Sequence, residues 1–243
     1  MAAIAPLVFP DRKRILVSEL GKTRLLWAAP SALSQELQLN RSIKPGAKAR
    51  HGEVRRLWPA ERDLFTAHLL RLDADTRRER FGTAVTDDFL RNYAETTFGV
   101  GGLVYAYVEA GEVRGAAELR GLEEIVIQTG EAAFSVERTW RRRGIGGELF
   151  SRLITAARNR NIRTLYMTCL PENAAMRNLA RKFEAEMVGG YADVEGRIAT
   201  GAPTPFTLLD EAMDNARSFA TLSLSLQRSF WPSALFGRSA SRH

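Results

Sequence analysis

The sequence predicts an α/β fold in which a mixed sheet carries helices on both of its faces. The composition is that of an ordinary globular chain, because 45% of the 243 residues are hydrophobic and 26% are charged. Apolar residues recur at helical spacing in two early segments and then alternate as in a strand hairpin. The remainder reads strand, helix, strand, helix, strand, strand, an order typical of helices packed on a sheet.

The chain ahead of this pattern is expected to be a basic arm. Residues 40–52 are polar and basic and contain the turn signal Pro45-Gly46, so we expect a linker there. Residues 14–27 fit either a short hairpin or a helix. The expected organisation is an N-terminal arm and linker at 1–52, a folded domain at 53–202 and a C-terminal helical extension at 203–243.

The first half of the domain is expected to hold a strand, two helices and a hairpin. Pro59 suits the first position of a helix, where its missing N–H is not needed. His68 lies on the apolar stripe of that helix, so we expect a buried or boundary histidine rather than a catalyst. Thr86 can cap the second helix through its side-chain oxygen. These elements are a strand at 53–57, helices from Pro59 and Thr86, and strands at 103–109 and 113–120.

The second half alternates strands and helices and ends in a long helix. The expected elements are strands at 131–136, 164–170, 188–193 and 197–200, and helices at 146–159, 173–187 and 206–228. The last helix carries too many apolar positions for a free tail. We expect it to pack against the domain or against a second subunit as a homodimer, with binding to a membrane surface as the alternative.

The distribution of charge argues against a nucleic-acid-binding protein. The net charge is +7, but residues 54–200 hold 22 Lys/Arg and 21 Asp/Glu, so the folded domain is almost neutral. The excess basicity lies in the N-terminal arm, which has no interleaved aromatic residues or recognised motif. We therefore expect no nucleic-acid partner.

Other classes are also disfavoured by composition. No apolar run approaches the roughly 20 residues that a transmembrane helix needs. The first ten residues lack a basic leading segment, so a secretory signal is not expected. The single cysteine, Cys169, fits a reducing cytoplasm, and with three histidines a metal cluster is not expected.

The most informative segment is a strand-to-helix junction rich in arginine and glycine. It reads Arg141-Arg142-Arg143-Gly144-Ile145-Gly146-Gly147 and lies between the strand at 131–136 and the helix at 146–159. The first turn of a helix has unsatisfied N–H groups and a partial positive charge, and glycine lets an anion come close to them. This junction therefore predicts a phosphate-binding site.

Arg141, Gly144 and Gly146 match the Arg/Gln-x-x-Gly-x-Gly/Ala signature of the GNAT superfamily of N-acetyltransferases. The segment 168–176, with Asn173 at the start of a helix, and the continuation at 179–183 resemble the superfamily's next strand and helix. The resemblance covers residues 53–200. It implies a mostly antiparallel sheet with a V-shaped splay between the fourth and fifth strands.

The resemblance implies that acetyl-CoA binds in the splay as co-substrate, without a metal. The N–H groups of 141–147 would hold the diphosphate, and Arg142 and Arg143 would add charge, although solvated surface arginines are the alternative. The strand edge at Phe134, Ser135 and Val136 would pair with the pantetheine arm, and an N–H near Val136 would polarise the thioester carbonyl. The coenzyme residues are Phe134, Ser135, Val136, Arg141, Arg142, Arg143, Gly144, Ile145, Gly146, Gly147, Asn173 and Met176.

Glu131 is our first candidate for the general base. The run 131–136 resembles the Glu-Phe-Ala-x-x-Val strand of Pat-type protein-lysine acetyltransferase domains, whose glutamate is the base. The alternative is that Glu131 begins a strand and points into water, and Glu118 on the preceding strand is the reserve. Ala180 stands where many family members have a tyrosine that acts as the general acid, so no general acid is assigned here. Cys169 is not expected to be a nucleophile.

The function expected from this resemblance is transfer of an acetyl group to a primary amine, on a protein lysine or a small molecule. A different class of function is a catalytically silent acyl-CoA-binding module that acts as a sensor. Turnover separates the two. Neither the identity of the amine nor the preferred acyl chain is encoded in a readable motif.

Overall fold

The computed structural model describes residues 51–99, 102–121, 128–190 and 193–230. Most of the expected N-terminal arm, including residues 14–27, lies outside the described residues. The strands are β1 (Glu53–Leu57), β2 (Leu103–Glu109), β3 (Glu112–Arg120), β4 (Thr129–Val136), β5 (Thr164–Cys169), β6 (Glu186–Gly189) and β7 (Val194–Ala199). The helices are η1 (Pro59–Glu61), α2 (Arg62–Arg71), α3 (Ala74–Phe81), α4 (Asp87–Thr97), η2 (Arg138–Trp140), α5 (Ile145–Asn159), α6 (Ala174–Lys182) and α7 (Pro205–Phe230).

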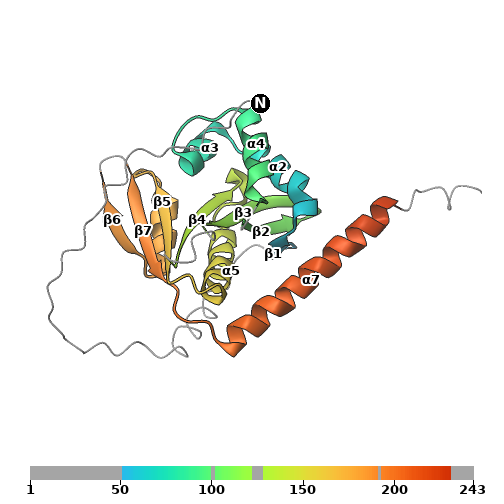
Figure 1. The fold of residues 1–243 in the computed structure, drawn as a ribbon. Coiled ribbons are helices and arrows are strands. Elements are labelled where there is room, and N and C mark those ends of the chain that lie inside the picture. The colour runs from blue at the N-terminus through green and yellow to red at the C-terminus, as the bar shows by residue number, and fades with distance from the viewer. Residues whose placement is uncertain (1–50, 100–101, 122–127, 191–192, 231–243) are drawn as a thin grey trace, which may run out of the picture. The chain divides into compact units, whose positions relative to one another are not determined.

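These strands form a sheet of seven strands in the order β1-β2-β3-β4-β5-β7-β6 (Figure 1). Only the β4–β5 pair is parallel, so the sheet is mixed and mostly antiparallel, as expected. No helix in the described part of the chain combines the length and the hydropathy needed to cross a membrane.

The sheet is buried on both faces, and β2 shows why. Leu103, Tyr105 and Tyr107 belong to the apolar cluster that includes the buried side of α5. The residues between them, Val104 and Ala106, belong to a second cluster with α2 and α4. Since side chains alternate across a strand, helices cover both faces of this half of the sheet, as predicted (Figure 1).

The parallel pair β4–β5 is short, and this opens the sheet. The two strands are paired only between Thr129–Glu131 and Thr164–Tyr166. Beyond Glu131, β4 remains paired with β3, and beyond Tyr166, β5 remains paired with β7. The strands therefore diverge in the V-shaped splay expected between the fourth and fifth strands.

Two predicted caps are present, and several boundaries need correction. The Thr86 side chain accepts a hydrogen bond from Phe89 N at 3.2 Å. Asn173 Oδ1 accepts one from Met176 N at 3.0 Å. The helix predicted at 173–187 ends at Lys182, because Glu184 adopts a left-handed φ of 58° and the chain turns into β6. The last two strands begin earlier than expected, at Glu186 and Val194, and β4 begins at Thr129.

The first helical region also differs from the prediction. Pro59 opens a single 3₁₀ turn, after which α2 carries the apolar stripe. A separate helix, α3, follows and was not predicted. Asp73 caps α3 by accepting a hydrogen bond from Thr76 N at 2.9 Å.

The long C-terminal helix α7 packs along the edge strand β1 and the outer side of α5. Ser218 Oγ accepts a hydrogen bond from the backbone N–H of Arg56 in β1 at 3.2 Å. Arg152 of α5 forms ion pairs with Asp210 and Asp214. These contacts correspond to packing against the domain, one of the arrangements expected from the sequence.

Candidate active site

The arginine-glycine junction forms a tight turn into α5. Gly144 is the N-cap of α5 with φ 81°, a conformation that favours glycine, and Arg142 is also left-handed with φ 64°. The first-turn amides of Ile145, Gly146 and Gly147 have no partner within the helix. A Cβ on Gly144 would meet nothing within 4 Å, so its lack of a side chain serves the backbone conformation and leaves room above the turn.

The three arginines of the junction have different roles. Arg141 donates to Val136 O at 3.2 Å and, through Nη2, to Thr76 Oγ1 and Glu79 at 2.8 Å each. It therefore ties the junction to α3 and is engaged by protein groups. Arg143 lies over the Trp140 ring at 4.4 Å. Arg142 is exposed and unengaged by other described residues, so its charge is available to an anion.

A further cation at this site was not predicted. Lys182, in the last turn of α6, has its Nζ 3.4 Å from the position that a Cβ on Gly147 would take. Leu179 of the same helix approaches Gly146 in the same way at 3.5 Å. The end of α6 thus lies beside the start of α5. The helical spacing of Leu179 and Lys182 was the available signal, but only the packing of the two helices gives it meaning.

The free edge of β4 faces the splay with two of the three residues predicted there. Glu137 N donates to Arg114 O at 3.0 Å, so main-chain groups of alternate residues, including Ser135, point to β3. The main-chain groups of Phe134 and Val136 then point into the splay. Because Arg141 Nε occupies Val136 O, the Val136 N–H is the group left for a ligand acceptor.

Ser135 belongs instead to a buried network on the face covered by α2. Ser135 Oγ lies 2.9 Å from His68 Nε2, and Glu137 Oε1 lies 3.3 Å from His68 Nδ1. Arg71 and Arg114 also donate to Glu137, at 2.9 and 3.1 Å. This network holds Ser135 and Glu137, the residues on either side of Val136, at the end of β4.

The network has a defined protonation state at neutral pH. Complete burial lowers the pKa of His68, so its imidazole is neutral. Burial alone would raise the pKa of Glu137, but hydrogen bonds from His68 and Arg71 outweigh it and lower that pKa to about 2. His68 is thus the buried histidine expected from the apolar stripe.

Glu131 lies where the splay begins. It is the last β4 residue paired with β5, with Tyr166 as its partner there and Arg120 as its partner on β3. Its side chain is exposed, and among the described residues it has no hydrogen-bond or ion-pair partner. A carboxylate in this position can accept a proton from an amine or a water molecule that enters the splay.

Glu118 is in the opposite situation. Its side chain is only 1% exposed and accepts hydrogen bonds from Arg80 at 2.7 Å, Tyr93 at 2.8 Å and Arg120 at 3.2 Å. Burial alone would raise its pKa, but Arg80 and Arg120 outweigh it, and the pKa is lowered. Glu118 is therefore an ionised member of a closed network, with both carboxylate oxygens engaged.

The remaining predicted residues are placed as follows. Asn173 uses its side-chain oxygen as the α6 cap, and Met176 packs partly buried against the core. Cys169 is buried on β5, and burial raises the pKa of its thiol. Within the described residues, no group of three or more His, Cys, Asp or Glu side chains is arranged to hold a metal ion.

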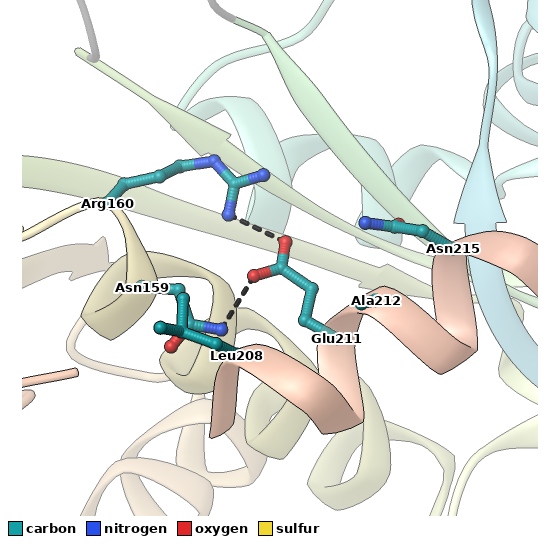
Figure 2. A pocket seen from close by; sticks show the side chains of 6 residues that line it. All are labelled: Asn159, Arg160, Leu208, Glu211, Ala212 and Asn215. Carbon is teal, nitrogen blue, oxygen red and sulfur yellow. Dashed lines mark hydrogen bonds and ion pairs between the residues drawn. The ribbon is translucent and has the colours of Figure 1, made fainter. Parts of the chain in front are cut away.

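A shallow pocket of about 300 Å³ lies elsewhere, between α5 and α7 (Figure 2). It is lined by Asn159, Arg160, Leu208, Glu211, Ala212 and Asn215. Figure 2 shows Glu211 accepting hydrogen bonds from Arg160 and Asn159, both at 2.7 Å. Since Asn159 ends α5 and the glycine turn begins it, the pocket is about 20 Å from the candidate site and separate from it.

Comparison with known proteins places the site in context. Residues 66–184 match the model of the acetyltransferase (GNAT) family. No curated protein sequence matches significantly. The fold is similar to that of the GNAT domain of S. lividans PAT, with 16% identity, a TM-score of 0.54, and coverage of 61% of this chain and 90% of that chain. It is also similar to an N-acetyltransferase from Staphylococcus aureus Mu50, with 18% identity, a TM-score of 0.50, and coverage of 63% and 100%.

Proposed function

Because residues 66–184 belong to the GNAT family of acetyltransferases, we propose that this chain transfers an acetyl group from acetyl-CoA directly to a primary amine. The observation that carries the proposal is the continuity of the β4 edge with the glycine turn of α5. The Val136 N–H ends β4 and the first-turn amides begin α5, so both groups of donors belong to the same strand-to-helix junction beside the splay. A thioester joined to a diphosphate through an amide-bearing arm suits that junction.

The donors divide the coenzyme into three parts. The amides from Ile145 to Gly147, with Arg142 and Lys182, take the diphosphate, since helix N-termini and cations both favour phosphate. The open β4 edge at Phe134 takes the amides of the pantetheine arm. The Val136 N–H then polarises the thioester carbonyl and stabilises the negative charge that develops on its oxygen.

Glu131 serves as the general base. An amine with a pKa near 10.4 is neutral in only about one molecule in 2,500 at pH 7, a deficit of about 4.6 kcal/mol. The exposed Glu131 carboxylate removes that proton, through water, as the amine nitrogen bonds to the acetyl carbon and the carbon–sulfur bond breaks. A thiol with a pKa near 8.5 leaves as its anion without a dedicated acid.

The acceptor is proposed to be a protein lysine or a small-molecule amine. The lysine option rests on the resemblance of the Glu131–Val136 run to Pat-type domains. The fold of this chain is also similar to that of the GNAT domain of S. lividans PAT. A cytoplasmic location is part of the proposal and rests on the single cysteine.

The test is turnover by the purified full chain. It is incubated with acetyl-CoA and separate panels of lysine peptides, peptides with free N-termini and small amines, while thiol release and acetylated product are measured. Release that depends on one amine class supports the proposal. Tight coenzyme binding without release on any amine identifies a silent acyl-CoA-binding module instead, and no coenzyme binding refutes both.

A further inference from the structure

The exposed apolar side chains of the described residues are concentrated on α7. Of the seven large hydrophobic residues that are exposed, only Val188 lies elsewhere. The six on α7 are between 49% and 66% exposed: Phe206, Leu208, Leu209, Met213, Phe219 and Leu224. A concentration of this kind marks an interaction surface more often than chance exposure does.

The helix docks on the domain with a mainly polar side that also buries Leu222. Thr207, Glu211 and Ser218 are buried there, and Asp214 pairs with Arg152. At about 100° per residue, the opposite side carries a continuous stripe at alternating spacings of three and four residues. This outer stripe consists of Phe206, Leu209, Met213, Ala216, Ala220 and Ser223.

The outer stripe alternates large and small residues in a way that fits an antiparallel copy of itself. In one register, Leu209 faces Ala220 of the other helix, Met213 faces Ala216, and Phe206 faces Ser223. Every layer then combines one large and one small side chain, which fills space evenly. The Ser223 hydroxyl already donates to Phe219 O at 2.9 Å, so it needs no partner from the second helix.

The flanking charges fit the same register. Asp210 and Arg217 lie on the same flank of the outer stripe, and same flanks face each other in antiparallel pairs. Asp210 of each helix, which also pairs with Arg152 of its own domain at 3.3 Å, would face Arg217 of the other, giving two opposite-charge contacts. A parallel pair would place Met213 on Met213 and Ala216 on Ala216, and it would bring neither charge to its opposite.

We propose that the outer stripe of α7 binds the outer stripe of a second copy of this chain in antiparallel register, forming a homodimer. A membrane surface fits less well. In sequence, α7 has three acidic residues, Asp210, Glu211 and Asp214, and two basic ones, Arg217 and Arg228, so it lacks the excess of basic residues that favours anionic lipids.

The first test measures mass in solution. Sedimentation velocity or light scattering on the full chain should show a dimer with a dissociation constant below about 10 μM. The double variant Leu209→Glu with Met213→Glu should raise the dissociation constant of the dimer about 100-fold or more. Its thermal unfolding should stay cooperative, because both side chains are solvent-exposed in the single chain. Val188→Glu, which alters the exposed apolar residue outside α7, should leave the mass unchanged.

Two results would overturn the proposal. One is a wild-type chain that is monomeric at 100 μM, about ten times the predicted limit of the dissociation constant. This result would count against the proposal even if a chain without residues 1–50 dimerised. The other is a monomer whose binding to vesicles is abolished by the double Glu variant.

Cysteine cross-linking tests the register. Position 216 lies about 4.5 Å along the axis from its copy, so Ala216→Cys should form an intermolecular disulfide, whereas buried Cys169 in the wild type should not. Position 220 lies about 16 Å from its copy, so Ala220→Cys alone should not cross-link. Mixed with Leu209→Cys chains it should. Equal cross-linking by both single variants would indicate a parallel pair and refute the register.

Discussion

Glu118 and Glu131 lie on the same face of the sheet, yet their surroundings are opposite. Arg120 is the cross-strand partner of Glu131 and lies two residues from Glu118 on β3, so all three side chains share a face. Glu118 is held by Arg80, Tyr93 and Arg120, whereas Glu131 is exposed where the strands separate.

The difference teaches how one sheet face divides support from chemistry. A carboxylate whose oxygens are all engaged and whose pKa is lowered keeps its charge and has no capacity for a further proton. An exposed carboxylate beside an open strand edge can exchange protons with a substrate. Glu118 therefore has a supporting position in this face of the sheet, and Glu131, where the strands separate, has the position that suits the proposed general base.

The largest effect is expected from Glu131→Gln. Loss of the proposed general base should lower kcat about 100- to 10,000-fold, while the dissociation constant of acetyl-CoA stays within a factor of about two. Steady-state thiol release and calorimetric titration of the coenzyme check the two expectations. If the variant turned over as fast as the wild type between pH 6 and 9, Glu131 would not be the base.

Glu118→Gln should reverse this pattern. The substitution leaves the buried Arg80 without its charged partner. It should lower the free energy of unfolding by about 3 kcal/mol, because the cost of burying the Arg80 charge is no longer offset by an opposite charge. Urea unfolding measures the loss. A variant as stable as the wild type but inactive would mean that the roles of the two glutamates are exchanged.

The network behind β4 predicts a pH dependence of stability. His68 has a lowered pKa in the folded state, so the unfolded chain binds a proton that the folded chain does not as pH falls below about 6.5. The contribution of His68 to the free energy of unfolding is therefore fully present above that pH. It declines below it, by up to about 1.4 kcal/mol per pH unit. The Glu137 contribution is lost only at lower pH, as the pH falls below about 4.5 toward about 2.

His68→Gln should flatten that decline between pH 6.5 and 5, the interval directly below the ordinary histidine pKa of 6.5. Urea unfolding at a series of pH values gives the slopes. His51→Gln is the matched control, since His51 is exposed, and it should retain the wild-type slope. Equal slopes in all three proteins would show that His68 is not responsible.

The smallest effect is expected from Lys182→Ala. Removing one exposed cation near the α5 turn should weaken acetyl-CoA binding about threefold to tenfold, more at low salt, without changing stability. Arg181→Ala removes the neighbouring charge from the same helical turn and is the control. If both variants weaken binding equally, the effect is general electrostatics rather than a contact of Lys182.

Much of the fold could be predicted because its signals are local. The caps at Thr86 and Asn173 and the glycine turn at Gly144 depend on residues a few positions apart. Helix α3 was missed because its sequence, ADTRRERF, has almost no apolar stripe, and Arg80 and Arg141 hold it in place through distant partners. The helix predicted at 173–187 extends beyond the end of α6, because Phe183 and Ala185 continue an apolar pattern past the turn at Glu184.

The site could be predicted to the level of the backbone but not of the long side chains. Glycines and strand alternation locate the turn and the open edge from the sequence. Whether Arg141 binds an anion or Glu79, and whether Lys182 reaches the α5 turn, depends on how helices pack. The same holds for Ser135, whose predicted coenzyme role competes with its bond to His68.

The Ser218 contact to β1 has a consequence for the solubility of the chain. An edge strand with free N–H groups is a template on which other chains can extend a sheet, and β1 is one edge of this sheet. By occupying the Arg56 N–H and packing against β1, α7 covers part of that edge and should hinder such extension. The other edge, β6, is only four residues long, too short to template extended pairing.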